Sequence, residues 1–96
     1  MTRIMEQFIS FIVKHLVDNP DAVHVEHVEK ESGRHLYRLH VGDGDLGQVI
    51  GKEGKTAKSI RTLVIAVAAR QGLRAGFEIV DPARPHLEDG QAADHE

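Results

Sequence analysis

The chain has 96 residues, of which 41% are hydrophobic and 28% charged, and it contains no cysteine. This length fits one domain, and the composition is typical of a folded globular protein rather than a disordered one. Without cysteine, disulfides, thiol catalysis and cysteine-ligated metals are excluded. No apolar run reaches membrane-spanning length and no signal-peptide pattern precedes the first apolar segment, so a cytoplasmic location is expected.

The formal net charge is -3, but it is unevenly distributed. Residues 81–96 contain five acidic residues and Arg84, a net -4, so residues 1–80 carry +1. Within these, positions 47–74 hold six basic residues against Glu53 alone, a net +5. Such a local basic patch is what a phosphate ligand requires, whatever the total charge. We expect a domain over residues 1–82, followed by an acidic, disordered tail over 83–96.

The first elements along the chain are a helix and two strands. Helical spacing of apolar residues from Ile4 to Leu16 predicts the helix, which ends before Asn19-Pro20. Alternating apolar and polar residues predict strands within 22–31 and 35–42, joined by a turn at 31–34. The three phenylalanines are expected in the core; they are Phe8, Phe11 and Phe77.

The second half of the chain predicts two helices and a last strand. Asp45 is placed to cap a short helix through Ile50. A helix of about four turns follows from Lys55 and ends at Gly72. Its core stripe is predicted to be Ile60, Leu63, Val64 and Val67. Residues 74–80 form the last strand, closed by Asp81-Pro82.

The most informative segment lies between those two helices, where Gly51 and Gly54 stand three residues apart. A glycine turn that opens a helix exposes backbone N–H groups, and the helix dipole adds partial positive charge there. Glycine also lets a sugar-phosphate backbone approach closely. Lys52, Lys55 and Lys58 add positive charge, whereas Glu53 opposes a phosphate. The pattern predicts a phosphate-binding loop.

The paired glycines also admit other interpretations. The paired glycines could form only a turn between helices, but an ordinary turn needs no surrounding lysines. A nucleotide-binding P-loop is rejected because it requires glycine where Val49 stands and a preceding strand. Arg61 is equally compatible with a phosphate contact and with a solvated helix face. Arg70 and Arg74 lie a helix length away, where a solvated role is favoured.

Neither metal binding nor catalysis is indicated. Strand alternation places His24 and His40 on one sheet face, but two histidines without cysteine do not make a zinc site, so no metal or other cofactor is expected. The serines lack a nucleophile elbow, and no two carboxylates are placed by spacing in a shared cleft. We therefore expect a protein that is not an enzyme.

The Val49–Leu63 run, with its Gly-Lys-Glu-Gly turn, resembles the GXXG signature of KH domains. Together with the order helix, strand, strand, helix, helix, strand and the Asp18–Val23 corner, it resembles the type II KH fold over residues 4–80. More narrowly, the chain is similar to small bacterial single-KH proteins of the KhpA type. The resemblance implies an α+β domain with three helices on one face of a three-stranded sheet. It also implies RNA rather than DNA, homodimerisation, and pairing with a larger KH protein of the KhpB type.

The expected function is single-stranded RNA binding by a GXXG loop that grips the phosphate backbone, as an RNA chaperone or post-transcriptional regulator. Val49, Ile50 and Ile60 are expected to supply apolar walls or support, and base stacking on aromatics is not expected. Ile65 and Ala69 share a second apolar helix face, which favours a homodimer through residues 55–71. A protein-interaction module with a vestigial loop, or an accessory subunit of a larger complex, remain alternatives. The predicted RNA-binding residues are Ile50, Gly51, Lys52, Glu53, Gly54, Lys55 and Lys58.

Overall fold

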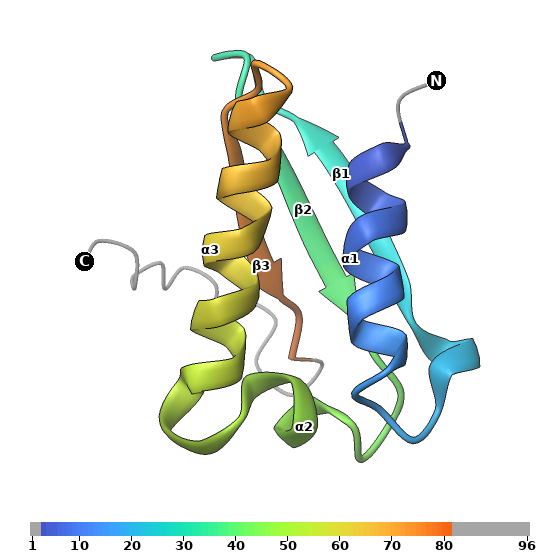
Figure 1. Cartoon of the computed structure of the whole chain (residues 1–96). Coiled ribbons are helices and arrows are strands. Elements are labelled where there is room, and N and C mark those ends of the chain that lie inside the picture. Colours follow the sequence, from blue (N-terminus) through green and yellow to red (C-terminus); the bar gives the residue numbers. More distant parts are fainter. Residues whose placement is uncertain (1–2, 82–96) are drawn as a thin grey trace.

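The computed structural model describes residues 3–81 (Figure 1). Its elements follow the predicted order; they are α1 (Ile4–Lys14), β1 (His24–Glu29), β2 (His35–His40), α2 (Leu46–Ile50), α3 (Lys55–Arg70) and β3 (Ala75–Ile79). Short 3-10 turns cover Pro20–Ala22 and Lys52–Gly54. The predicted acidic tail over 83–96 lies outside the described residues. None of the helices within residues 3–81 combines the length and the apolar character needed to span a membrane.

The three strands form one sheet in the order β1-β2-β3. The β1–β2 pair is antiparallel, with Val25 opposite Leu39, and Gly33 provides the positive φ of 89° in its turn. The β2–β3 pair is parallel, with Tyr37 opposite Phe77, so α2 and α3 form the crossover between them. The predicted strands are confirmed, each slightly shorter than its apolar pattern.

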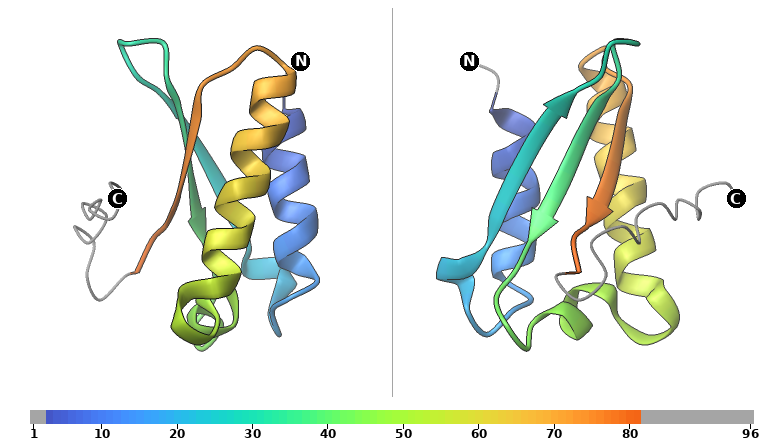
Figure 2. Two further views of the ribbon diagram at one scale, coloured as in Figure 1. Left: turned by 60° about the vertical axis from the view of Figure 1, so that its left-hand side comes forward. Right: turned by 180° about the vertical axis from the view of Figure 1, so that it is seen from behind.

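The two long helices, α1 and α3, cover one face of the sheet and leave the other open (Figure 2). α1 lies along β1 and α3 along β3. This confirms the α+β class and the three-stranded sheet. The placement of the third predicted helix differs, because α2 has only five residues and packs against α3 beyond the end of the sheet.

The core face of α1 differs from the prediction. Met5, Ile9 and Val13 are the residues that α1 buries, at four-residue spacing. Phe11 was expected in the core but is 66% exposed, whereas Phe8 packs at the margin of the core and Phe77 is buried. The apolar arc of α1 is wider than the contact that the sheet and α3 provide, so part of it faces outward.

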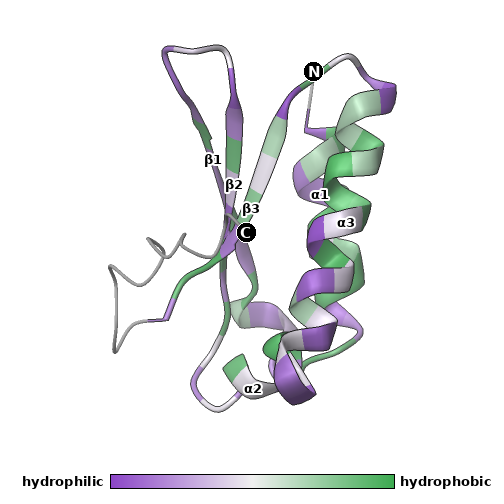
Figure 3. Cartoon of the chain, turned by 90° about the vertical axis from the view of Figure 1, so that its left-hand side faces the viewer, coloured by the Kyte–Doolittle hydropathy of each residue, from purple (hydrophilic) through white to green (hydrophobic). Residues whose placement is uncertain are grey.

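The core stripe of α3 is also shifted from the prediction. Its buried residues are Ile60, Val64 and Ala68, with Val67 half-buried beside them. Leu63 is 47% exposed, so its assignment to the core was wrong. At 3.6 residues per turn, Leu63 lies about 100° around the helix from Val64, outside the buried arc. In Figure 3 hydrophilic colouring is strongest in the N-terminal half of α3, and apolar colouring dominates its C-terminal half.

Because the buried stripe of α3 is shifted, the larger loss of stability is expected for a substitution at Ile60 and the smaller loss for one at Leu63. Ile60→Ala removes a buried side chain and should cost roughly 2–5 kcal/mol of unfolding free energy. Leu63→Ala removes a half-exposed one and should cost less than about 1 kcal/mol. Urea melts of both variants and the wild type provide the comparison. A larger loss for Leu63→Ala than for Ile60→Ala would contradict the packing described here.

The open sheet face carries a polar network across all three strands. Arg38 of β2 lies 3.8 Å from Glu26 of β1 and 3.6 Å from Glu78 of β3. His40 Nε2 lies 3.1 Å from the Glu26 carboxylate, and its ring is 5.6 Å from that of His24. The predicted pairing of these histidines on one face is confirmed. Charged pairs that link adjacent strands add to the cross-strand stabilisation of the sheet.

Tyr37 is buried on the helix-covered face, with the ring of His27 stacked on it at 4.8 Å. Burial, with a smaller contribution from the nearby Glu6 carboxylate, raises the pKa of Tyr37 above its ordinary value. The unfolded chain therefore loses this proton first as the pH rises above about 10. Folding stability that depends on the protonated phenol is present below that pH and is lost as the pH rises through the folded-state pKa.

Tyr37 is the only tyrosine, and no tryptophan is present, so near-ultraviolet absorbance reports its ionisation directly. We expect the phenolate to form at higher pH in the folded protein than in urea. The Glu6→Gln variant should move the folded-state titration part of the way back. Identical titration curves in the folded and unfolded states would contradict the burial of this ring.

Candidate nucleic-acid interface

The base of the glycine loop is fixed by Asp45, whose side chain is only 1% exposed. Its two carboxylate oxygens accept hydrogen bonds from the backbone N–H groups of Asp18, at 3.2 Å, and Asn19, at 3.0 Å. Asp45 occupies the predicted N-cap position of α2 but makes no side-chain bond to that helix, so the predicted capping contact is wrong. The carboxylate instead joins α2 to the corner that follows α1.

Gly51 ends α2 with φ 79° and ψ 173°, a conformation that L residues with a side chain rarely adopt. A Cβ added to Gly51 would lie 2.7 Å from the Cβ of Thr56 and 2.9 Å from its backbone nitrogen. Both the backbone angle and the lack of space therefore require glycine. The reversal lets the first turn of α3 pack directly against the end of α2.

The second glycine is required for a different reason. Gly54 lies in the left-handed region with φ 75° and ψ 11°, but a Cβ added there would meet no atom within 4 Å. The space over Gly54 is therefore open to a ligand. Glu53 also has a positive φ, 58°, the only non-glycine residue to do so in the described part of the chain. Its side chain is exposed.

Backbone donors are available at the tip of this loop. The N–H of Gly51 donates to Gly47 O, and that of Gly54 donates to Gly51 O. The N–H groups of Lys52 and Glu53 meet no acceptor among residues 3–81. These two N–H groups are consecutive and belong to exposed residues, so they can donate to the oxygens of an anion.

Positive charge surrounds these donors. Lys52, Lys55 and Lys58 are all exposed, and no carboxylate in the described part of the chain forms an ion pair with any of them. Lys55 and Lys58 lie in or next to the first turn of α3, where the free N–H groups of the helix add partial positive charge. All the predicted charged residues of the site therefore lie together around one loop.

The apolar residues beside the loop divide into two groups. Val49 and Ile60 are buried and hold the loop against the core, whereas Ile50 is 36% exposed next to Gly51. Ile50 is therefore the apolar surface that a ligand can reach.

Arg61, for which the sequence allowed either a phosphate contact or a solvated role, is half-buried on α3. The close packing of Thr56 against Gly51 was not predicted. The signal that indicates it is the glycine itself, five residues earlier, because a residue without a side chain permits such a contact.

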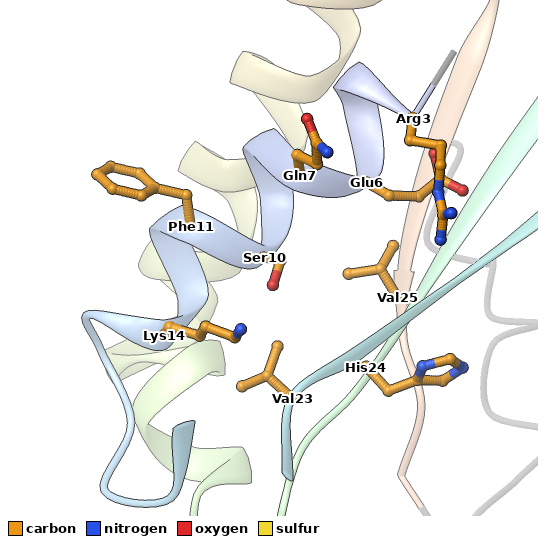
Figure 4. Close-up of a pocket in the computed structure, with 9 residues that line it drawn as sticks. All are labelled: Arg3, Glu6, Gln7, Ser10, Phe11, Lys14, Val23, His24 and Val25. Carbon is orange, nitrogen blue, oxygen red and sulfur yellow. The ribbon is translucent and has the colours of Figure 1, made fainter. Parts of the chain in front are cut away.

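A separate depression of about 480 Å³ lies between α1 and the outer edge of β1 (Figure 4). Since β1 and β3 are opposite edges of the sheet, this depression is away from the α3–β3 side. Its lining mixes Glu6 with Arg3, Lys14 and neutral side chains. Within residues 3–81, no three histidine, aspartate or glutamate side chains come together in a way that could hold a metal ion.

A helix–strand–strand–helix–helix–strand domain with a GXXG turn between its last two helices is a type II KH domain. Residues 6–79 match the family model described as "KhpA/KhpB, KH domain". This match covers most of the chain, which therefore belongs to the KhpA/KhpB KH-domain family.

Relatives with curated names agree with this assignment. RNA-binding protein KhpA of Chlamydia trachomatis serovar D is 44% identical over 77 residues, which are 80% of this chain and 97% of that protein. RNA-binding protein KhpA of Listeria monocytogenes serovar 1/2a is 43% identical over 77 residues, 80% of this chain and 100% of that protein. The Clostridium perfringens protein of the same name is 42% identical, again over its whole length.

Proposed function

We propose that this protein binds single-stranded RNA and that the loop from Gly51 to Gly54 holds the phosphate backbone. The observation that carries the proposal is the loop itself. It presents consecutive free N–H groups at Lys52 and Glu53, open space over Gly54, and three lysines without ion-pair partners among the described residues. The names of the relatives, all RNA-binding proteins, support RNA as the nucleic acid.

In this proposal the RNA backbone crosses the loop and the bases extend past Ile50 toward the side where α3 packs on β3. KH domains bind about four nucleotides with such a loop. Phosphate contacts supply most of the affinity and position the strand, while contacts to the bases supply preference. With Tyr37 and Phe77 buried, stacking of bases on aromatic rings has no part in this surface.

The cellular role that we propose is that of an RNA chaperone or post-transcriptional regulator acting in the cytoplasm without enzymatic activity. A short loop with moderate charge binds weakly and reversibly, which suits a protein that exchanges among transcripts. The site residues that we propose are those predicted from the sequence, Ile50, Gly51, Lys52, Glu53, Gly54, Lys55 and Lys58.

Changing Lys52 and Glu53 together to aspartate should weaken RNA binding at least about tenfold at low salt, because it replaces an attractive charge by a repulsive one. The fold should be retained, because both side chains are exposed and aspartate tolerates the positive φ of position 53 better than glutamate. Fluorescence anisotropy with a labelled single-stranded RNA, measured across a salt series, gives the affinity and its salt slope.

The chain contains a matched control, since Lys30-Glu31 is the same dipeptide, exposed in the β1–β2 turn at the opposite end of the molecule. Changing Lys30 and Glu31 to aspartate alters the net charge equally, and in the part of the salt series near 0.15 M, where the Debye length is about 8 Å, this turn is screened from the loop. This control should bind RNA nearly as the wild type does. Equal losses in both variants would mean that overall charge matters and that the loop is not the site.

We also propose that the protein forms a homodimer through the outer face of α3, and that the same face can pair with a larger KH protein of the KhpB type. Ile65 is 47% exposed, and Ala66 and Ala69 are exposed near it. A solvated helix face normally carries polar residues at such positions. Pairing two domains joins two weak loops and raises the avidity for RNA long enough to reach both.

Ile65→Glu should convert the dimer to a folded monomer, since burying a carboxylate at a helix contact is costly. Light scattering at tens of micromolar gives the mass, and anisotropy should show weaker binding of long RNA with little change for short RNA. Ser32→Glu, an exposed change in the β1–β2 turn, is the control for the added charge. A monomeric wild type at that concentration would exclude the dimer.

A further inference from the structure

One charged segment has no role in the site described above. Four acidic residues and Arg84 give residues 83–96 a net charge of -3; the acids are Glu88, Asp89, Asp94 and Glu96. The family match ends at residue 79. Relatives from Listeria and Clostridium are matched over 100% of their length by only about 80% of this chain. The acidic segment is thus an addition to a domain that is complete without it.

The fold directs this addition toward the glycine loop. β3 runs parallel to β2, toward the end of the molecule that carries α2 and the loop (Figures 1 and 2). The described chain ends at Asp81, two residues after β3. Seven further residues can extend up to about 23 Å. This length compares with 34 Å for the longest dimension of the Cα trace, and the chain leaves β3 on the side of the loop.

The loop is the chemical complement of this segment. Lys52, Lys55 and Lys58 are exposed and have no carboxylate partner among residues 3–81. The free N–H groups of Lys52 and Glu53 can donate to a carboxylate as readily as to a phosphate, since both ligands offer anionic oxygen acceptors. The opposite end of the molecule carries Lys30, Arg34, Arg70 and Arg74 beside Glu29 and Glu31, but β3 runs away from that end, so the segment that follows β3 starts on the side of the loop.

We propose that residues 83–96 bind to the basic face of the glycine loop and compete there with RNA. The inference rests on the proposed function, because the competitor is the RNA that the loop holds. Tethering gives the segment a high effective concentration at the loop, so individually weak ion pairs suffice. If the segment occupies the loop for about two thirds to nine tenths of the time, the apparent RNA affinity falls roughly three- to tenfold.

The test uses two full-length variants that each change the net charge from -3 to -1. Glu88→Gln with Asp89→Asn neutralises the segment, and Glu29→Gln with Glu31→Gln is the control at the opposite end of the molecule. The segment variant should bind labelled single-stranded RNA about two- to fivefold more tightly at low salt, with the gain shrinking as salt screens the contact. The control should change the affinity by much less. Equal gains in the two variants, or no gain in either, would overturn the proposal.

A second measurement reports the contact without RNA. In ¹H–¹⁵N spectra of the free protein, the amide signals of Gly51 to Gly54 should move when the segment is neutralised and stay in place in the control. If those amides move while neither protein binds RNA, the contact stands and the proposed function fails. If RNA binds but the amides do not respond to the segment, the proposed function stands and this inference fails.

Discussion

The carboxylate of Asp45 is the interaction on which the arrangement of the site depends. It is the only charged side chain fully buried in the described part of the chain, and two backbone N–H groups of the Asp18–Asn19 corner compensate its burial. A helix of five residues such as α2 is not stable alone, because nucleating so short a helix is unfavourable. The bond from Asp45 to the corner after α1 fixes where α2 begins, and the loop that follows has a rigid base.

From this base the chain reverses once, at Gly51, and the contact of Gly51 with Thr56 determines where α3 starts. The exposed surface of α3 then changes character along its length. Its N-terminal half carries the exposed lysines next to the free amides of the loop, and its C-terminal half exposes Leu63 and Ile65. In the function proposed above, ligand and partner meet different halves of one helix, and the proposed dimer leaves both loops uncovered.

The residues proposed for the site lie within nine consecutive positions, from Ile50 to Lys58, so local pattern is sufficient to place them together. The element order followed equally from local signals, such as the positive φ that Gly72 supplies after α3. The predictions that failed depend on contacts between residues far apart in the sequence. Phe11 and Leu63 are apolar, but which side of each helix meets the sheet depends on how the helices pack. The partners of Asp45 are 26 and 27 residues away, so its position suggested a helix cap that the structure does not form.

Charge in this chain is better described by segment than by the total of -3, since the basic loop and the acidic addition have opposite signs. A tethered acidic competitor lowers the apparent affinity of every ligand at a loop by the same factor, because it changes the fraction of loops that are free. It therefore adds no sequence preference. It removes weakly held RNA first, while a ligand that engages two loops keeps the large gain from effective concentration. Preference among sequences must then come from contacts that the competitor does not imitate, and the exposed apolar side chain of Ile50 beside the loop is one such contact.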